Sequence, residues 1–187
     1  MSGREKFAKY VFLINLITKF FKYSPEFLVD ISWSFSQLSN NNICNVIRYA
    51  ILKNRCKYLG DNVFISKNVE LLNIGSLSIG HNVSIHKSTY IDAIGSIEIG
   101  DNVSIAHSSS LVSFEHGYDD ESIPIKYNII KLDPIFISND VWIGCGVRVL
   151  AGSQISARTI IAAGAVVKGS CSRGIWAGIP AKKVREF

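Results

Sequence analysis

One short pattern returns along the chain from Leu59 onward, and it constrains the fold more than any other feature. It reads LGDNVFI at 59–65, IGHNVSI at 79–85, IGDNVSI at 99–105 and ISNDVWI at 137–143. An amphipathic helix would need a period of 3.6 residues, which this stretch lacks. The repeat can instead be tiled in units of six with an aliphatic residue at positions 65, 79, 85, 91, 99, 105, 111, 137, 143, 149, 155, 161 and 167.

The six-residue unit has a direct physical meaning. It is long enough for one short strand and one turn, so three units close a triangular coil of eighteen residues, and coils stack at about 4.8 Å, the spacing of paired strands. The signature copies begin 20, 20 and 38 residues apart. Two corners therefore carry small insertions, and one carries a long loop at about 113–134. The sequence predicts a mainly β protein, a parallel β-helix, whose handedness the period alone does not determine.

The net charge of +5 is unevenly distributed over the 187 residues. Residues 1–58 carry nine basic and three acidic side chains, 59–167 carry six and eleven, and 168–187 carry five and one. A nucleic-acid-binding protein usually has a basic stripe along one folded face, and the acidic middle lacks one. With 48% hydrophobic and 19% charged residues the chain is not disordered. We therefore expect a globular protein that does not bind nucleic acid.

Residues 1–58 lack the repeat and form a separate region. Apolar residues between 7 and 21 fall on one helical face among lysines, and a second helical stretch is expected near 43–56. Two interpretations stay open: a cap on the open end of the coil, or a basic aromatic helix in peripheral contact with a membrane. The apolar run at 10–18 is too short to span a bilayer, and no signal-peptide cleavage site follows it. We expect an α-helical extension at 1–58 and a repeat domain at 59–187.

Three further segments stand among the repeats: SFEHGYDD at 113–120, DPIFISNDVWIG at 133–144 and AGIPAKKVREF at 177–187. With these segments, the chain resembles the hexapeptide-repeat acyltransferases over about 59–187, and within them the maltose/galactoside and polysaccharide O-acetyltransferase branch. The resemblance implies a left-handed β-helix and a homotrimer with active sites between subunits. It also implies acetyl-CoA as the donor, no metal, and a sugar hydroxyl as the acceptor, in a glycoside or in a capsule, O-antigen or lipopolysaccharide unit.

The long loop holds the candidate catalytic base. A sugar hydroxyl attacks a thioester only if its proton leaves as the new bond forms, and an imidazole that titrates near neutral pH suits this task. His116 matches the looped-out catalytic histidine of the similar enzymes. Its orienting partner stays open between Asp92, on the corner of the previous coil, and Asp119, with Glu115 as a third candidate. Asp92, Asp119 and Tyr118 are also candidates for binding the acceptor.

The resemblance also implies where the donor binds. It maps the backbone amide that meets the thioester oxygen to Cys145, and a contact of the pantetheine arm to Ala163, within the alanine- and glycine-rich run at 160–169. Trp142 is a candidate to cover the pantetheine. Coenzyme A carries phosphates that need cations, for which the candidates are Lys168, Lys182 and Arg185.

Two other enzyme functions stay open. One is N-acetylation of an amino-sugar nucleotide by the same fold. The other is a zinc hydratase similar to the γ-carbonic anhydrases, with His81, His86 and His107 on the coil wall as neutral imidazole ligands. The long loop and the AGIPAKK tail favour the enzyme that uses coenzyme A. The four cysteines form no C-x-x-C pair, so we expect reduced thiols in a cytoplasmic protein, free or at the inner face of the bacterial cytoplasmic membrane.

Overall fold

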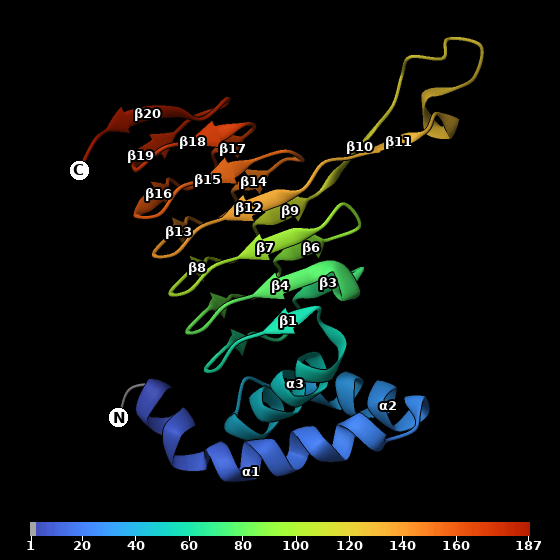
Figure 1. Ribbon diagram of the computed structural model, residues 1–187, viewed down its shortest axis with the longest axis vertical. Helices are drawn as coiled ribbons and strands as arrows, with labels where there is room; N and C mark the ends of the chain where they lie inside the picture. Colours follow the sequence, from blue (N-terminus) through green and yellow to red (C-terminus); the bar gives the residue numbers. More distant parts are fainter. Residues whose placement is uncertain (1–2) are drawn as a thin grey trace.

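The computed structural model describes residues 3–187 as a helical segment followed by a long coil of short strands (Figure 1). The helices end at Arg55 and the first strand begins at Tyr58, beside the expected boundary. The first and third helices match those predicted from the sequence; the second, which follows Pro25, was not predicted. The helices are α1 (Gly3–Tyr23), α2 (Glu26–Ser36) and α3 (Asn42–Arg55).

The strands form three parallel faces. Face A holds β1 (Tyr58–Leu59), β4 (Leu77–Ile79), β7 (Ile97–Ile99), β12 (Ile135–Ile137), β15 (Gln154–Ile155) and β18 (Ser170–Cys171). Face B holds β2 (Phe64–Ile65), β5 (Ser84–Ile85), β8 (Ser104–Ile105), β13 (Trp142–Ile143), β16 (Thr159–Ile161), β19 (Gly174–Ala177) and the antiparallel β20 (Lys182–Arg185). Face C holds β3 (Glu70–Leu72), β6 (Tyr90–Asp92), β9 (Ser110–Val112), β14 (Arg148–Val149) and β17 (Val166–Val167). The chain visits the faces in the order A, B, C, so it is the expected parallel β-helix.

The aliphatic position of each hexapeptide points into the coil. Strand pairing places Ile85 over Ile65 and Ile161 over Ile143, so each column of the core repeats one sequence position. All thirteen expected core positions are between 0% and 3% exposed. Burial of one such column after another supplies the main apolar stabilisation of the fold.

The corners use residues that tolerate the left-handed backbone conformation. At the corner between faces A and B the asparagine of the signature takes this role, with φ of 55° at Asn62 and 58° at both Asn82 and Asn102. At the corner between faces B and C this role is taken by Asn68, Ser88 and Ser108 in the lower coils, and by Gly146 and Gly164, with φ of 67° and 71°, in the upper ones. Asparagine and glycine adopt this conformation at least cost, so at the corners that they occupy the repeat favours the turn; at Asp140 and Arg158 the coil holds other residue types in the same conformation.

The helices cover the open end of the coil. Tyr49 and Leu52 of α3, with Ile14 of α1, join Leu59 and Val63 of the first coil in one apolar core. The Tyr49 hydroxyl also donates a hydrogen bond of 3.1 Å to the Gly60 carbonyl. This arrangement is the one that the cap interpretation predicts. None of the helices in residues 3–187 is long and apolar enough to cross a membrane.

The long loop leaves the coil at the corner between faces C and A and forms a projecting arm (Figure 1). Its stem is the antiparallel pair of β10 (Phe114–His116) and β11 (Ile130–Leu132), with Glu115 opposite Lys131. The 3₁₀ turn η2 (Ile125–Tyr127) lies toward its tip, and a second turn, η1 (Ile74–Ser76), fills the same corner two coils below. The loop predicted at 113–134 is confirmed.

Candidate active site

His116 lies at the end of the first arm strand, where it is exposed. It pairs with Ile130 across the stem, and its ring lies 6.2 Å from the ring of Phe114 in an edge-on arrangement. An imidazole on a projecting strand can approach a substrate held by another surface without first breaking internal contacts. His116 is therefore placed where a general base for an external hydroxyl could act.

The three carboxylates considered as partners of His116 all have other partners within residues 3–187. Asp92 is buried on the corner below and accepts a 2.7 Å hydrogen bond from the Asn73 amide. Asp119 forms a 2.6 Å ion pair with Lys131, and the Lys131 ammonium lies over the ring of exposed Tyr118, at 5.3 Å. Asp119, Lys131 and Tyr118 of the arm thus interact with one another rather than with His116.

Glu115, the third candidate, contacts the ammonium of Lys168, which ties the arm to the upper coil. Lys168 follows β17 at the corner between faces C and A, and so it lies with the arm and away from the cations of β20. Both Asn73, the partner of Asp92, and this ion pair went unnoticed in the sequence. Their partners lie far along the chain, and nothing in the local pattern marks them.

Cys145 and Ala163 lie one above the other at the corner between faces B and C. Strands β13 and β16 pair with Ile143 opposite Ile161, and the Gly164 amide donates to the Cys145 carbonyl at 2.9 Å. Within residues 3–187 neither the Cys145 nor the Ala163 amide has a hydrogen-bond acceptor. A Cβ at Gly144 would lie 2.6 Å from the Ala163 nitrogen, so glycine is needed for this close approach. The corner therefore offers two stacked amide donors to a ligand.

The remaining donor-site candidates follow one row across face B. The strand registers align Trp142 with Ile160, Ile160 with Ile175, and Ile175 with Arg185. Trp142 is 54% exposed and Arg185 is exposed, so the row presents an apolar surface that ends in a cation. Lys182, also exposed, lies on the same last strand opposite Ala177. An apolar track with a cationic end matches a pantetheine arm that carries phosphates.

The two halves of the candidate site lie at different corners of one chain. His116 and Asp92 belong to the corner between faces C and A, whereas Cys145 and Ala163 belong to the corner between faces B and C. Face C separates them. A single chain therefore does not bring the candidate base and the candidate amides together.

The histidines considered as zinc ligands do not converge. His81 lies at the corner between faces A and B, where it contacts the Tyr58 hydroxyl at 3.0 Å. His86 and His107 lie at the corner between faces B and C. Residues 3–187 contain no group of three or more histidine, cysteine or acidic side chains that could hold a metal ion.

Comparison with known proteins adds to this geometry. No family model matches the chain. The probable acetyltransferase Rv3034c of Mycobacterium tuberculosis is 38% identical over 76 residues, which are 40% of this chain and 25% of that protein. The chain thus matches only a quarter of the length of this curated relative.

Solved structures match over most of their length. The hexapeptide-repeat containing acetyltransferase VCA0836 from Vibrio cholerae has a TM-score of 0.74 at 24% identity, covering 92% of both chains. Its complex with acetyl coenzyme A gives 0.73 at 25% identity, over 85% of this chain and 87% of that one. Galactoside acetyltransferase in complex with coenzyme A gives 0.70 at 24% identity, over 97% of this chain and 82% of that one.

The chain has the fold of the hexapeptide-repeat acetyltransferases. The coil is accordingly the left-handed parallel β-helix that the resemblance implies, preceded by helices and interrupted by one long loop. Two of these structural neighbours are crystallised with acetyl-CoA or coenzyme A, as expected for the donor.

Proposed function

We propose that the protein transfers the acetyl group of acetyl-CoA to a hydroxyl of a sugar. The observation that carries this proposal is that the candidate base and the candidate donor site occupy different parts of the coil. An exposed imidazole stands on a projecting arm, while stacked free amides and a cation-ended apolar row lie on face B and its corner. The likeness to an acetyltransferase crystallised with acetyl-CoA supports the same donor here.

The reaction uses four groups of the chain. The imidazole of His116 accepts the proton of the sugar hydroxyl as its oxygen attacks the thioester carbon. The carbonyl oxygen becomes an oxyanion, which accepts a hydrogen bond from the Cys145 amide. As the carbon–sulfur bond breaks, the imidazolium returns the proton to the thiolate, so that coenzyme A leaves as a thiol and the sugar keeps the acetyl group. Lys182 and Arg185 bind the phosphates.

We further propose a homotrimer in which the arm of one subunit reaches the corner of the next. Two features support it: the separation of His116 from Cys145 within one chain, and the apolar surface of the arm. Ile125, Tyr127 and Ile129 are 63%, 69% and 86% exposed. Side chains of this kind favour burial against another protein surface.

The proposal is tested by incubating the purified protein with acetyl-CoA and a panel of glycosides and following the free thiol. His116→Ala is expected to lower turnover by about 100-fold or more, because general-base catalysis contributes 10²–10⁴ in rate. His81→Ala, at the corner between faces A and B and away from both halves of the candidate site, is the control and should keep its activity. Full activity of the His116 variant would refute the assignment of the base.

The acceptor class is decided in the same assay. A parallel panel of amino-sugar nucleotides distinguishes N- from O-acetylation, since alkaline hydroxylamine removes an acetyl ester from the product but leaves an acetamide intact. Turnover restricted to the amino sugars would replace the O-acetyltransferase proposal by N-acetylation. No release of thiol with any acceptor, in protein that binds acetyl-CoA, would contradict both.

A further inference from the structure

The helical end of the molecule exposes two apolar stripes that no part of residues 3–187 covers. The stripe on α1 runs from Phe12 to Tyr23 with spacings of four, four and three residues. The stripe that begins on α2 runs from Phe27 to Leu38 with the same spacings, so each member lies fifteen residues after its counterpart on α1. These spacings keep side chains on one face of a helix. We call the two stripes the docking face; its members are Phe12, Leu16, Phe20, Tyr23, Phe27, Ile31, Phe35 and Leu38.

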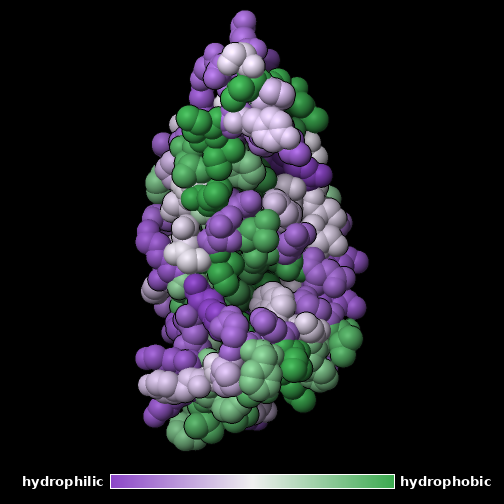
Figure 2. All heavy atoms as spheres, turned by 90° about the vertical axis from the view of Figure 1, so that its right-hand side faces the viewer, coloured by the Kyte–Doolittle hydropathy of each residue, from purple (hydrophilic) through white to green (hydrophobic). Residues whose placement is uncertain are grey.

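The docking face points away from the rest of the protein. Its eight side chains are between 52% and 81% exposed. The inward face of α1 carries buried Ile14 and Phe21, and that of α2 carries buried Val29, which packs with Phe21 against α3. Apolar side chains gather at this end of the molecule in the space-filling view (Figure 2). A contiguous apolar surface of this kind indicates an interaction site in a soluble protein.

Basic residues flank the docking face. Lys9 lies three residues before Phe12, and Lys19 lies three residues after Leu16, so both exposed ammonium groups flank the α1 stripe. Lys22 is also exposed and lies 5.7 Å from the ring of Tyr23. Long lysine side chains can keep an apolar stem along such a surface while the ammonium reaches a neighbouring polar layer.

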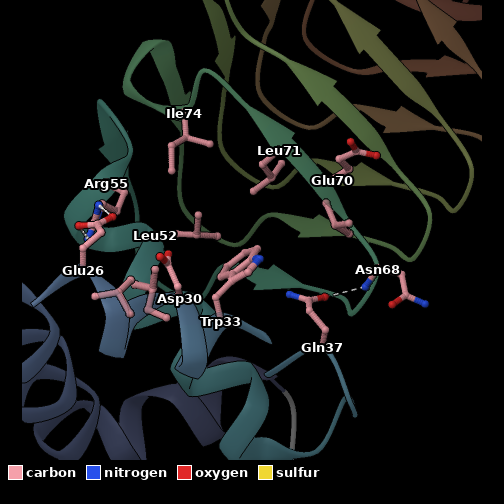
Figure 3. Close-up of a pocket in the computed structure, with 13 residues that line it drawn as sticks. Glu26, Asp30, Trp33, Gln37, Leu52, Arg55, Asn68, Glu70, Leu71 and Ile74 are labelled. Carbon is pink, nitrogen blue, oxygen red and sulfur yellow. Dashed lines mark hydrogen bonds and ion pairs between the residues drawn. The ribbon is translucent and has the colours of Figure 1, made fainter. Parts of the chain in front are cut away.

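The acids of α2 lie elsewhere, along a cavity of about 560 Å³ between α2, α3 and β3 (Figure 3). Glu26 forms a bidentate pair with Arg55 there, at 2.7 and 2.8 Å, and Asp30 lines the same cavity. Basic groups thus accompany the apolar stripe of α1, while the acids of α2 are turned toward the coil.

We propose that the docking face binds the surface of a membrane that contains anionic lipids, with α1 and α2 lying in the plane of the interface. Apolar side chains enter the acyl boundary while the flanking lysines meet anionic headgroups. A second copy of the chain is the less suitable occupant, because a two-fold contact through this face would gather Lys9, Lys19 and Lys22 of both copies at one interface, where like charges repel. The proposal is independent of the acetyl-transfer reaction.

Flotation of the full-length protein with lipid vesicles tests the proposal. We expect it to float with vesicles of phosphatidylcholine and phosphatidylglycerol and to partition at least about tenfold less into vesicles of phosphatidylcholine alone, since only the former offer anionic headgroups to the lysines. Raising the salt concentration should weaken binding by screening. Absence of flotation with both vesicle types overturns the proposal.

Matched variants separate the two components of binding. One variant removes apolar area and combines Phe12→Ser with Phe20→Ser. The other removes charge and combines Lys9→Gln, Lys19→Gln and Lys22→Gln. Each variant is expected to partition into the anionic vesicles about tenfold less than the unmodified protein. Ile179→Ser, 75% exposed near the opposite end, is the control and should float as the unmodified protein does.

The variants also test the competing occupant. All replaced side chains are exposed, so the thermal unfolding midpoint should change little, which identifies any variant that fails to fold. Variants that float as well as the unmodified protein would overturn the proposal. The proposal would also be overturned if the unmodified protein did not float and the variants had a lower mass in solution by light scattering. The docking face would then be a contact between copies of the chain.

Discussion

Cys145 is the residue at which the backbone and the side chain are expected to behave differently. Its amide is free for a ligand, while its thiol is partly exposed at the same corner. Burial raises the pKa of the Cys56 thiol to about 12 and that of Cys171 to about 11, and Cys44 is 2% exposed. A thiol with a raised pKa stays protonated, and therefore unreactive, until the pH approaches that value.

We therefore predict that iodoacetamide labels Cys145 first in the native protein at pH 8, and that coenzyme A slows this labelling. Peptide mass spectrometry identifies the site. Labelling of Cys56 and Cys171 should become appreciable only as the pH rises toward 11 and above. Cys145→Ala should keep turnover within a few-fold, because the amide remains; a loss of 100-fold would show that the thiol itself takes part.

Arg48 joins three elements at the base of the coil. It lies on α3 with 0% of its surface exposed, and its Nε donates a 2.7 Å hydrogen bond to the Ile65 carbonyl at the end of β2. Its other nitrogens reach the Ser39 carbonyl at 3.1 Å, the Ser36 carbonyl at the end of α2, and the Asn40 side chain at 3.0 Å. Burial lowers the pKa of this guanidinium.

Replacing Arg48 should destabilise the packing of the helices on the first coil. Arg48→Met leaves several buried carbonyl groups without a donor, and we expect a loss of about 2–4 kcal/mol in the free energy of unfolding. Urea titration followed by circular dichroism measures it. Arg55→Met is the control, since the pair of Arg55 and Glu26 is exposed and should contribute far less. Equal losses in both variants would show that Arg48 does not hold the elements together.

The elements differ in how far the sequence reveals them. Each strand is specified locally, because one hexapeptide carries both its buried aliphatic residue, such as Ile105, and its turn residue, such as Asn102. Phe27, Ile31 and Phe35 recur at helical spacing, so the sequence does contain a signal for helix α2 that the prediction did not use; what the spacing does not reveal is that this apolar stripe faces outward. Arg48 would be placed on the surface by its residue type alone.

The whole molecule presents its candidate base and its candidate donor site at separate corners, and this leads to a prediction about mixed assemblies. We expect His116→Ala and Ala163→Trp each to be inactive, the latter because an indole fills the exposed position that coenzyme A would contact. Refolding the two as an equal mixture should restore about a quarter of the normal activity if each site takes its base from one subunit and its donor corner from the next.

A mixture without activity would show that each site is built by one chain. Light scattering supplies the mass of the assembly, expected at three times the 20.7 kDa of one chain. Ile129→Glu, at the most exposed apolar position of the arm, should lower that mass, whereas Lys126→Glu on the same arm keeps the apolar surface and should not.

The sequence by itself determined the coil: the period of six set the strand length, the burial of every core column and the left-handed turn residues, because each of these is fixed within one hexapeptide. It also revealed the long loop with its histidine, since an excursion interrupts the period visibly. Only the tertiary structure decided the partners of Asp92, Asp119 and Glu115, the closure of the coil by Arg48 and Tyr49, and the unpartnered docking face. Those features depend on which distant segments meet, and a local pattern does not contain that information.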